Sequence, residues 1–178
     1  MMRTITVAVL AFISTNVDDL FLLTIWFLKR TRLGVVALGQ VVGFSALLLI
    51  SLLGYFGTTL LPQQHVHWLG VVPIAIGIKQ LRSKHEEDNS PADSWWTVAT
   101  ITAAHGGDNL AVYVPLFARY DLRSVSLIVA SFYITLGFFV GVARIGTKRL
   151  AHNALVHRMA HRISPFVIIL IGVLILFS

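Results

Sequence analysis

Six long apolar stretches, separated by short polar segments, limit what this chain can fold into more than any other feature of its sequence. They are predicted at residues 4–28, 33–61, 67–81, 95–117, 122–143 and 163–177. A helix needs about 20 mainly apolar residues to cross the hydrocarbon core of a bilayer. Six such stretches use most of the 178 residues. The chain is therefore predicted to be an all-α membrane protein with six transmembrane helices, surrounded by the lipid bilayer.

The composition leaves no room for a sizeable soluble domain. Only 12% of the residues are charged and the mean hydropathy is +0.80, whereas soluble proteins carry roughly 25% charged residues. The chain has no cysteine, which excludes disulfides, thiolate metal sites and thiol catalysis. The net charge of +6 comes from basic residues that flank the apolar stretches. We therefore expect no nucleic-acid partner.

The basic residues also predict the orientation of the chain. Eleven of the 14 Lys and Arg residues lie beside the ends of the first, third and fifth stretches, and only Arg3, Arg119 and Arg123 lie on the other side. Cytoplasmic loops of membrane proteins are enriched in Lys and Arg. This split predicts a multi-pass protein of the plasma (inner) membrane, with both termini outside and the polar linker 83–94 in the cytoplasm.

Two similar motifs lie in the middle of the first and fourth stretches. Residues 15–20 (TNVDDL) and 105–110 (HGGDNL) both carry Asp at the fourth place and Leu at the sixth. Two glycine pairs, Gly39/Gly43 and Gly137/Gly141, recur in the second and fifth stretches, where they would let helices approach closely. We therefore predict two three-helix repeats, 1–82 and 95–178, joined by the linker 83–94. Because three is odd, the second repeat is inverted, as in many secondary transporters that bind substrate at the midplane.

Carboxylates at the centre of a bilayer require a partner. Leaving Asp18, Asp19 and Asp108 ionised and unpaired there would cost on the order of 8–10 kcal/mol, and no stretch carries a central Lys or Arg. Protonated acids bonded to the backbone would explain one Asp more easily than three. We therefore predict a cation site. Oxygen donors with one imidazole suit a hard or borderline divalent ion, and whether the imidazole is a ligand stays open. The candidate metal ligands are Asp18, Asp19, Asp108, Asn109, Asn16, Thr15 and His105.

Five short motifs follow one another along nearly the whole chain. They are Thr15-Asn16-Val17-Asp18-Asp19, Gly39-Gln40-x-x-Gly43, Pro73-Ile74-x-x-Gly77, Gly106-Gly107-Asp108-Asn109 and Tyr113-Val114-Pro115-Leu116-Phe117. In this order they resemble the cadmium-resistance transporter family of the lysine-exporter-like superfamily. Two positions depart from that family's usual residues, His105 in place of Asn and Val41 in place of Tyr. The resemblance implies export of Cd²⁺ or a similar divalent ion across the plasma membrane.

These features together predict a secondary transporter that exports a divalent heavy-metal cation. Cd²⁺ is the first expectation, with Zn²⁺ or a similar ion as an alternative. No nucleotide-binding P-loop is present. Moving a divalent cation outward against 100 mV costs about 4.6 kcal/mol, which inward proton flow by antiport can supply. We expect no enzyme activity and no bound cofactor, and a homodimer stays open. The alternatives are export of an amino acid or organic cation, a passive channel, a metal sensor and, remotely, an intramembrane aspartyl hydrolase.

Overall fold

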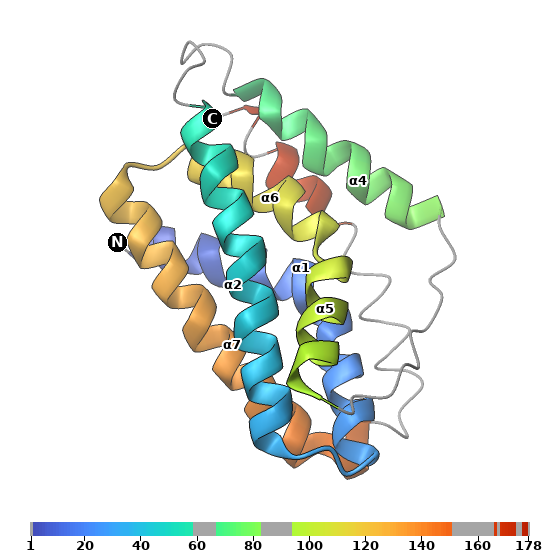
Figure 1. Cartoon of the computed structure of the whole chain (residues 1–178). Helices are drawn as coiled ribbons and strands as arrows, with labels where there is room; N and C mark the ends of the chain where they lie inside the picture. Colours follow the sequence, from blue (N-terminus) through green and yellow to red (C-terminus); the bar gives the residue numbers. More distant parts are fainter. Residues whose placement is uncertain are drawn as a thin grey trace.

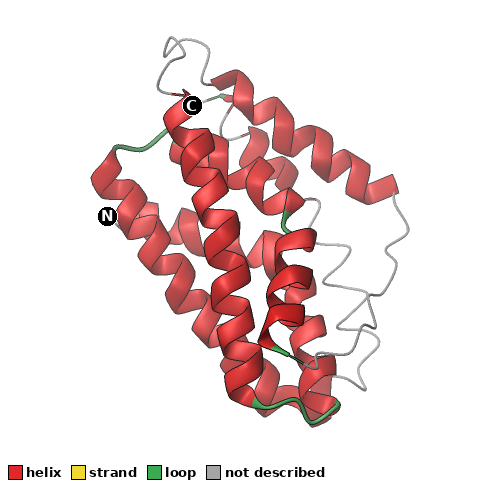
Figure 2. Ribbon diagram, viewed as in Figure 1, coloured by secondary structure: helices red, strands yellow, loops and turns green. Residues whose placement is uncertain are grey.

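The computed structural model describes residues 2–58, 67–82 and 94–150, with residues 166, 168–173, 176 and 177 near the C-terminus. This part of the chain is built from helices and loops and contains no strand (Figures 1 and 2), which confirms the all-α prediction. The elements are α1 (Met2–Leu28), α2 (Leu33–Thr58), the 3₁₀ helix η1 (His67–Gly70), α4 (Val71–Arg82), α5 (Trp95–His105), α6 (Gly107–Phe117) and α7 (Leu122–Leu150).

Three of the described helices are long and apolar enough to cross a bilayer. They cover Met2–Leu28, Leu33–Thr58 and Leu122–Thr147. By contrast, α4 has 12 residues and α5 and α6 have 11 each, fewer than the roughly 20 that a span needs. Together α5 and α6 fill the predicted fourth span, which is interrupted at Gly106. The linker 83–93 and much of the sixth stretch lie outside the described residues, so the division into two repeats stays a prediction.

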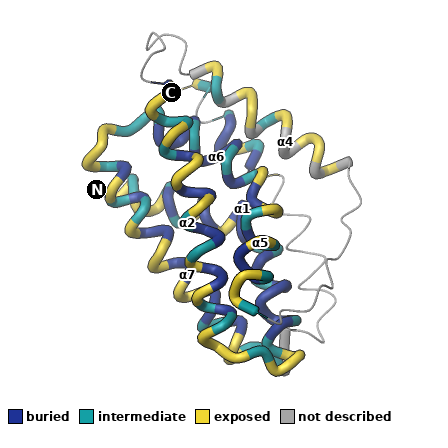
Figure 3. Tube along the Cα trace, viewed as in Figure 1, coloured by how far each residue is buried: buried dark blue, intermediate teal, exposed yellow. Residues whose placement is uncertain are grey.

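The outer faces of the long helices are apolar, which suits contact with lipid. On α2, Leu49 and Leu53 are 61% and 63% exposed, and on α7, Ile134 and Phe138 are 75% and 66% exposed. Figure 3 shows the corresponding alternation along α2 and α7, with buried segments turned toward the other helices and exposed ones outward. Exposure of apolar surface of this kind to water is unfavourable. The structure therefore supports the membrane setting that the sequence predicts.

The most extensive contacts between helices join α1 to α7 and α2 to α5. Glycine explains the second contact, because a Cβ atom built on Gly43 would lie 2.6 Å from the carbonyl oxygen of Ala99 in α5. Small residues at such spacing let two backbones come together. Gly137 and Gly141 of α7, by contrast, have no atom within 4 Å of an added Cβ. Among the described helices, close packing is thus confirmed for the first glycine pair only.

Replacing Gly43 by Ala is expected to lower the free energy of unfolding by about 1–3 kcal/mol, as overpacking of a tight contact does. The new methyl group would press on backbone atoms of α5, which cannot move alone. Gly137→Ala is the matched control, and it is expected to be neutral or to stabilise by up to about 1 kcal/mol, because Ala is the better helix former. Thermal unfolding of the purified protein in detergent measures both. Equal melting temperatures for the two variants would contradict the close contact.

Local signals explain where the later helices begin. The Ser94 hydroxyl accepts a hydrogen bond from the backbone N–H of Thr97 at 3.2 Å and so caps α5. Asp121 precedes α7, and hydrogen bonds from the Ser124 side chain and from nearby backbone amides lower the pKa of its carboxyl group. These caps satisfy N–H groups that would otherwise lack partners at the helix ends.

An aromatic layer forms the centre of the core where α1, α2, α6 and α7 meet. It consists of Phe12, Phe44, Tyr113 and Phe132, all buried. The ring centroids of Phe12 and Phe44 are 5.3 Å apart, and those of Tyr113 and Phe132 are 4.5 Å apart. Contacts at this distance stabilise a core beyond the area they bury. These ring contacts fix how the four helices are positioned relative to one another along their axes.

Candidate functional site

Both acidic motifs lie where a helix is interrupted. In α1 the backbone of Asn16 is non-helical, with φ −122° and ψ 15°. The other break, between α5 and α6, falls at Gly106, with φ −79° and ψ 20°. An added Cβ at this second position would overlap the end of the Leu47 side chain of α2, so a larger residue there requires Leu47 to move. Breaks of this kind free polar backbone groups inside a membrane protein, where they can line a binding site.

Side chains of the two motifs are hydrogen-bonded to each other. The Asn109 amide nitrogen donates to the Asn16 amide oxygen at 3.1 Å. The Tyr113 hydroxyl lies 2.8 Å from the amide nitrogen of Asn16 and 3.0 Å from the hydroxyl of Thr15. All four side chains are buried. The structure thus brings together three of the predicted site residues, Thr15, Asn16 and Asn109, and adds Tyr113.

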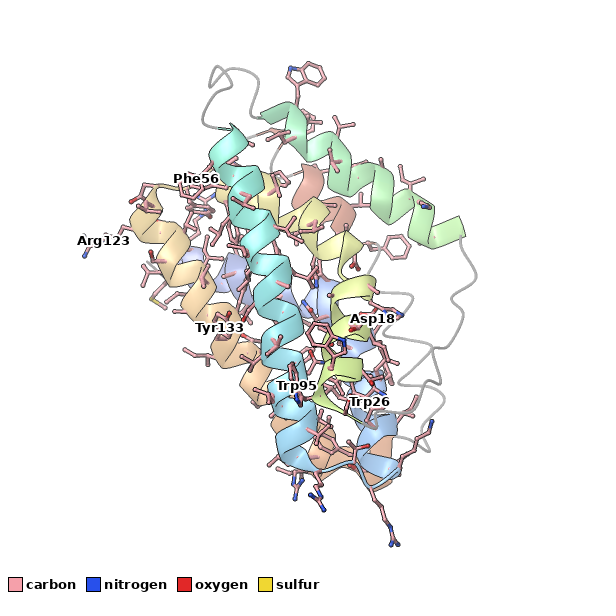
Figure 4. The ribbon with its side chains drawn as sticks, in the orientation of Figure 1. Asp18, Trp26, Phe56, Trp95, Arg123 and Tyr133 are labelled. Carbon is pink, nitrogen blue, oxygen red and sulfur yellow. The ribbon has the colours of Figure 1, made fainter. Side chains whose placement is uncertain are left out.

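The three aspartates lie around this hydrogen-bonded cluster. Asp19 is 6% exposed, Asp18 and Asp108 are partly buried, and the charges of both act on Asp19. Figure 4 labels Asp18 on α1. In each motif the first Asp accepts a hydrogen bond from the next backbone N–H, Asp18 from Asp19 at 3.1 Å and Asp108 from Asn109 at 3.0 Å. The two motifs therefore share a local geometry as well as a sequence pattern.

His105 ends α5 and its side chain is exposed, whereas Asn109 of the same motif is buried. Its ring Nδ1 lies 3.0 Å from the carbonyl oxygen of Ile101. Among the described residues, no three His, Asp or Glu side chains come close enough to hold a metal ion by themselves. The metal-ligand set predicted from the sequence, His105 included, therefore stays a prediction.

Buried polar atoms without partners reveal further residues of interest. Gln40 of α2 is 1% exposed, and within the part of the chain that the structure describes neither its amide oxygen nor its amide nitrogen has a hydrogen-bond partner. The hydroxyl of Thr102 and the amide oxygen of Asn109 are also buried without a partner. Such groups destabilise a fold by about 1–3 kcal/mol each. They are the groups expected where a ligand or water binds in the interior.

The hydrogen-bonded amides of the two motifs lie on one side of the aromatic layer. Asn16 follows Phe12 by four positions in α1, while Asn109 precedes Tyr113 by four in α6. The turn at residues 29–32 reverses the chain, so α1 runs opposite to α2, and α6 runs with α2 (Figure 1). We call Asn16 and Asn109 the polar layer. Gln40 lies nearer the start of α2, because the neighbouring Gly39 packs on Val98 of α5, whereas Gly106 packs on Leu47.

Sequence reasoning placed Gln40 and Tyr113 in motifs but did not propose either as a functional residue. A signal for Gln40 was present, because it is the one amide side chain in residues 33–61, and polar groups at membrane depth are often functional. For Tyr113 the only signal was its spacing of four residues from Asn109. Neither residue carries a charge, and charge was the feature that identified the motifs.

The fold and the site define a helical membrane protein with carboxylates and amides at two helix breaks in its interior. A family model described as cadmium resistance transporter matches residues 12–178, and the chain belongs to that family. This confirms the resemblance noted from the sequence and makes the protein a membrane transporter. Neither a curated protein nor a solved structure gave a match.

Proposed function

We propose that this transporter exports Cd²⁺, or a similar divalent cation such as Zn²⁺, in exchange for protons. The site would combine the polar layer with Asp18, Asp19 and Asp108. The observation that carries the proposal is the hydrogen bond between Asn16 and Asn109. It joins two residues that are 93 positions apart in the sequence, one from each acidic motif, as a single site built from both motifs requires.

Three further observations support an inverted repeat around this site. Each motif sits at a break in its helix, and each holds its first Asp in the same bond to the next N–H. The helix contacts also match, since α1 packs on α7 and α2 packs on α5. Exchange of the two repeats would convert one contact into the other. Such a layout allows one repeat to rock against the other around a fixed site.

The donor set suits a divalent cation held by oxygen. Carboxylates supply the charge, while the amide oxygen of Asn109, which has no partner among the described residues, can replace water around the ion without adding charge. No thiolate is available, so binding of a soft ion is moderate enough to permit release. Protons and metal compete for the same carboxylates, because a protonated acid no longer attracts the cation. Protonation at the site would therefore expel the ion.

The aromatic layer suggests which way the site opens. It lies on the side of the polar layer that faces the start of α1, which the Lys and Arg distribution predicts to be outside. The rings of Phe12, Phe44 and Phe132 would block passage of a hydrated ion on that side. We therefore propose that metal enters from the cytoplasmic side, and that rocking of the repeats opens the aromatic layer for release.

Export in cells tests the proposal. Cells that produce Asp18→Asn or Asp108→Asn are expected to accumulate Cd²⁺ as cells without the protein do, although both variants reach the membrane. Asp121→Asn is the matched control, because it makes the same change at an exposed carboxylate outside the long helices. Radioactive Cd²⁺ retained per cell, normalised to the amount of protein in the membrane, is the readout. Normal export by both motif variants would refute the proposed site.

A further inference from the structure

A groove with three arginines lies at one end of the bundle, away from the polar layer. It has a volume of about 720 Å³ and is formed by the turn between α1 and α2 and by the last turns of α7. Figure 1 shows that these segments meet at the same end of the molecule. Arg30, Arg32 and Arg144 line it, and none of the described residues that line it is acidic. Three guanidinium groups around one open space repel one another unless an anion is present.

Two of these arginines are held in place by local structure. Arg30 has a φ of 63°, a left-handed conformation that disfavours residues other than glycine. The turn keeps it there through backbone hydrogen bonds from Arg30 to Phe27 and from Thr31 to Trp26, both 3.1 Å. The Arg144 guanidinium lies 5.9 Å from the centre of the Phe27 ring, a cation–π contact. Strained backbone of this kind is often kept where it serves binding.

The rest of the groove wall is apolar and exposed. Leu28, Leu33 and Ile145 line it and are 43%, 40% and 87% exposed. The groove also marks a boundary, since α1 ends at Leu28, α2 begins at Leu33 and the apolar part of α7 ends at Thr147. Charged and apolar groups thus alternate where the hydrocarbon core would meet the headgroups. A ligand for this wall has an anionic head and an apolar body.

We propose that this groove binds a phosphate group, supplied by the headgroup of an anionic phospholipid. The guanidinium fork matches phosphate oxygens in pairs, and basic pockets between membrane helices on the cytoplasmic side are known to suit lipid phosphates. The Lys and Arg distribution predicts this same side for the groove. Free phosphate offers the same oxygens without the acyl chains, so the apolar wall distinguishes the two sources. Bound lipid would tie α7 to the α1–α2 turn.

Native mass spectrometry of the full chain in detergent tests the proposal with phosphatidylglycerol, phosphatidylcholine and inorganic phosphate as probes. The natural chain is expected to retain phosphatidylglycerol, and Arg32→Gln/Arg144→Gln is expected to bind it about tenfold to thirtyfold more weakly, in line with the contribution of two basic groups at a membrane surface. Arg32→Lys/Arg144→Lys should keep part of the affinity. Arg30 is left unchanged, because its backbone conformation makes any substitution ambiguous.

The control is Arg3→Gln/Arg123→Gln, which removes two exposed arginines far from the groove. Figure 4 shows Arg123 pointing away from the bundle at the start of α7. Unchanged lipid retention in this control, with loss in the groove variant, would support the site. Binding of inorganic phosphate but not of phosphatidylglycerol would assign the groove to free phosphate. If Arg32→Gln/Arg144→Gln and Arg3→Gln/Arg123→Gln retain every probe equally, the proposal is overturned, even if the carboxylate site transports metal as proposed.

Discussion

Asp19→Asn is expected to abolish metal export while leaving the protein as stable as the natural chain, or more so. Asp19 is the most deeply buried of the three acids, at 6% exposure, and it lies within reach of the charges of Asp18 and Asp108. Replacing it by a neutral isostere relieves repulsion among like charges, so the fold loses nothing. A bound cation, however, loses a charged ligand. We expect transport to fall by at least about a hundredfold, beyond the effect of losing an outer-shell group.

Two readouts separate this result from simple misfolding. Thermal unfolding in detergent reports stability, and metal uptake by reconstituted vesicles reports transport. Asp121→Asn, at an exposed position, should match the natural chain in both. If Asp19→Asn transports at the normal rate, or if it unfolds well below the natural chain, Asp19 is a structural residue and the site must lie elsewhere.

Gln40→Leu is expected to raise stability and to weaken transport at the same time. Both amide atoms of Gln40 are buried without a partner, so an apolar side chain of similar size removes a penalty of about 1–3 kcal/mol. A residue that serves only packing would not combine higher stability with weaker transport when it is replaced. If the ion meets the Gln40 amide on its way from the cytoplasmic side to the polar layer, the half-saturating metal concentration should rise about tenfold or more, as expected when an interaction of about 1.4 kcal/mol is lost.

Ser51→Ala is the matched control for Gln40→Leu. Ser51 is also buried in α2, but its hydroxyl donates to the carbonyl oxygen of Leu47 at 2.8 Å. Its loss should change stability little and leave the metal dependence of transport unchanged. A drop in the melting temperature of Gln40→Leu would show that the amide is satisfied in the native protein. Unchanged metal dependence would show that Gln40 does not interact with the ion.

The sequence predicted the membrane class and the motif residues because both follow from simple physical limits. Long apolar stretches need lipid, and central carboxylates need a partner. The hydrogen bond between Asn16 and Asn109 also agrees with the expectation that the two motifs meet. Spacing on a regular helix did not predict the break at Asn16. The break at Gly106 falls at two adjacent glycines, Gly106 and Gly107, which weaken a continuous helix.

Packing partners were also beyond what the sequence could supply. Gly39/Gly43 and Gly137/Gly141 have the same spacing, yet of the two pairs only the first packs closely on another described helix. Spacing shows that a close approach is sterically allowed, but the neighbour depends on the whole arrangement of helices. For the same reason the aromatic layer was not foreseen. Its rings come from four helices and look like ordinary apolar residues in each of them.

The central claim is that the two broken helices form one cation site that exchanges metal for protons. Inside-out membrane vesicles with an acidic interior, supplied with Cd²⁺, Zn²⁺, Mn²⁺ or Ca²⁺, test it most directly when the natural chain is compared with Asp108→Asn. We predict that the pH gradient drives Cd²⁺ into vesicles carrying the natural chain, and that a protonophore or Asp108→Asn stops the uptake. Uptake of none of the four ions, or uptake that persists in Asp108→Asn without the gradient, would contradict the claim.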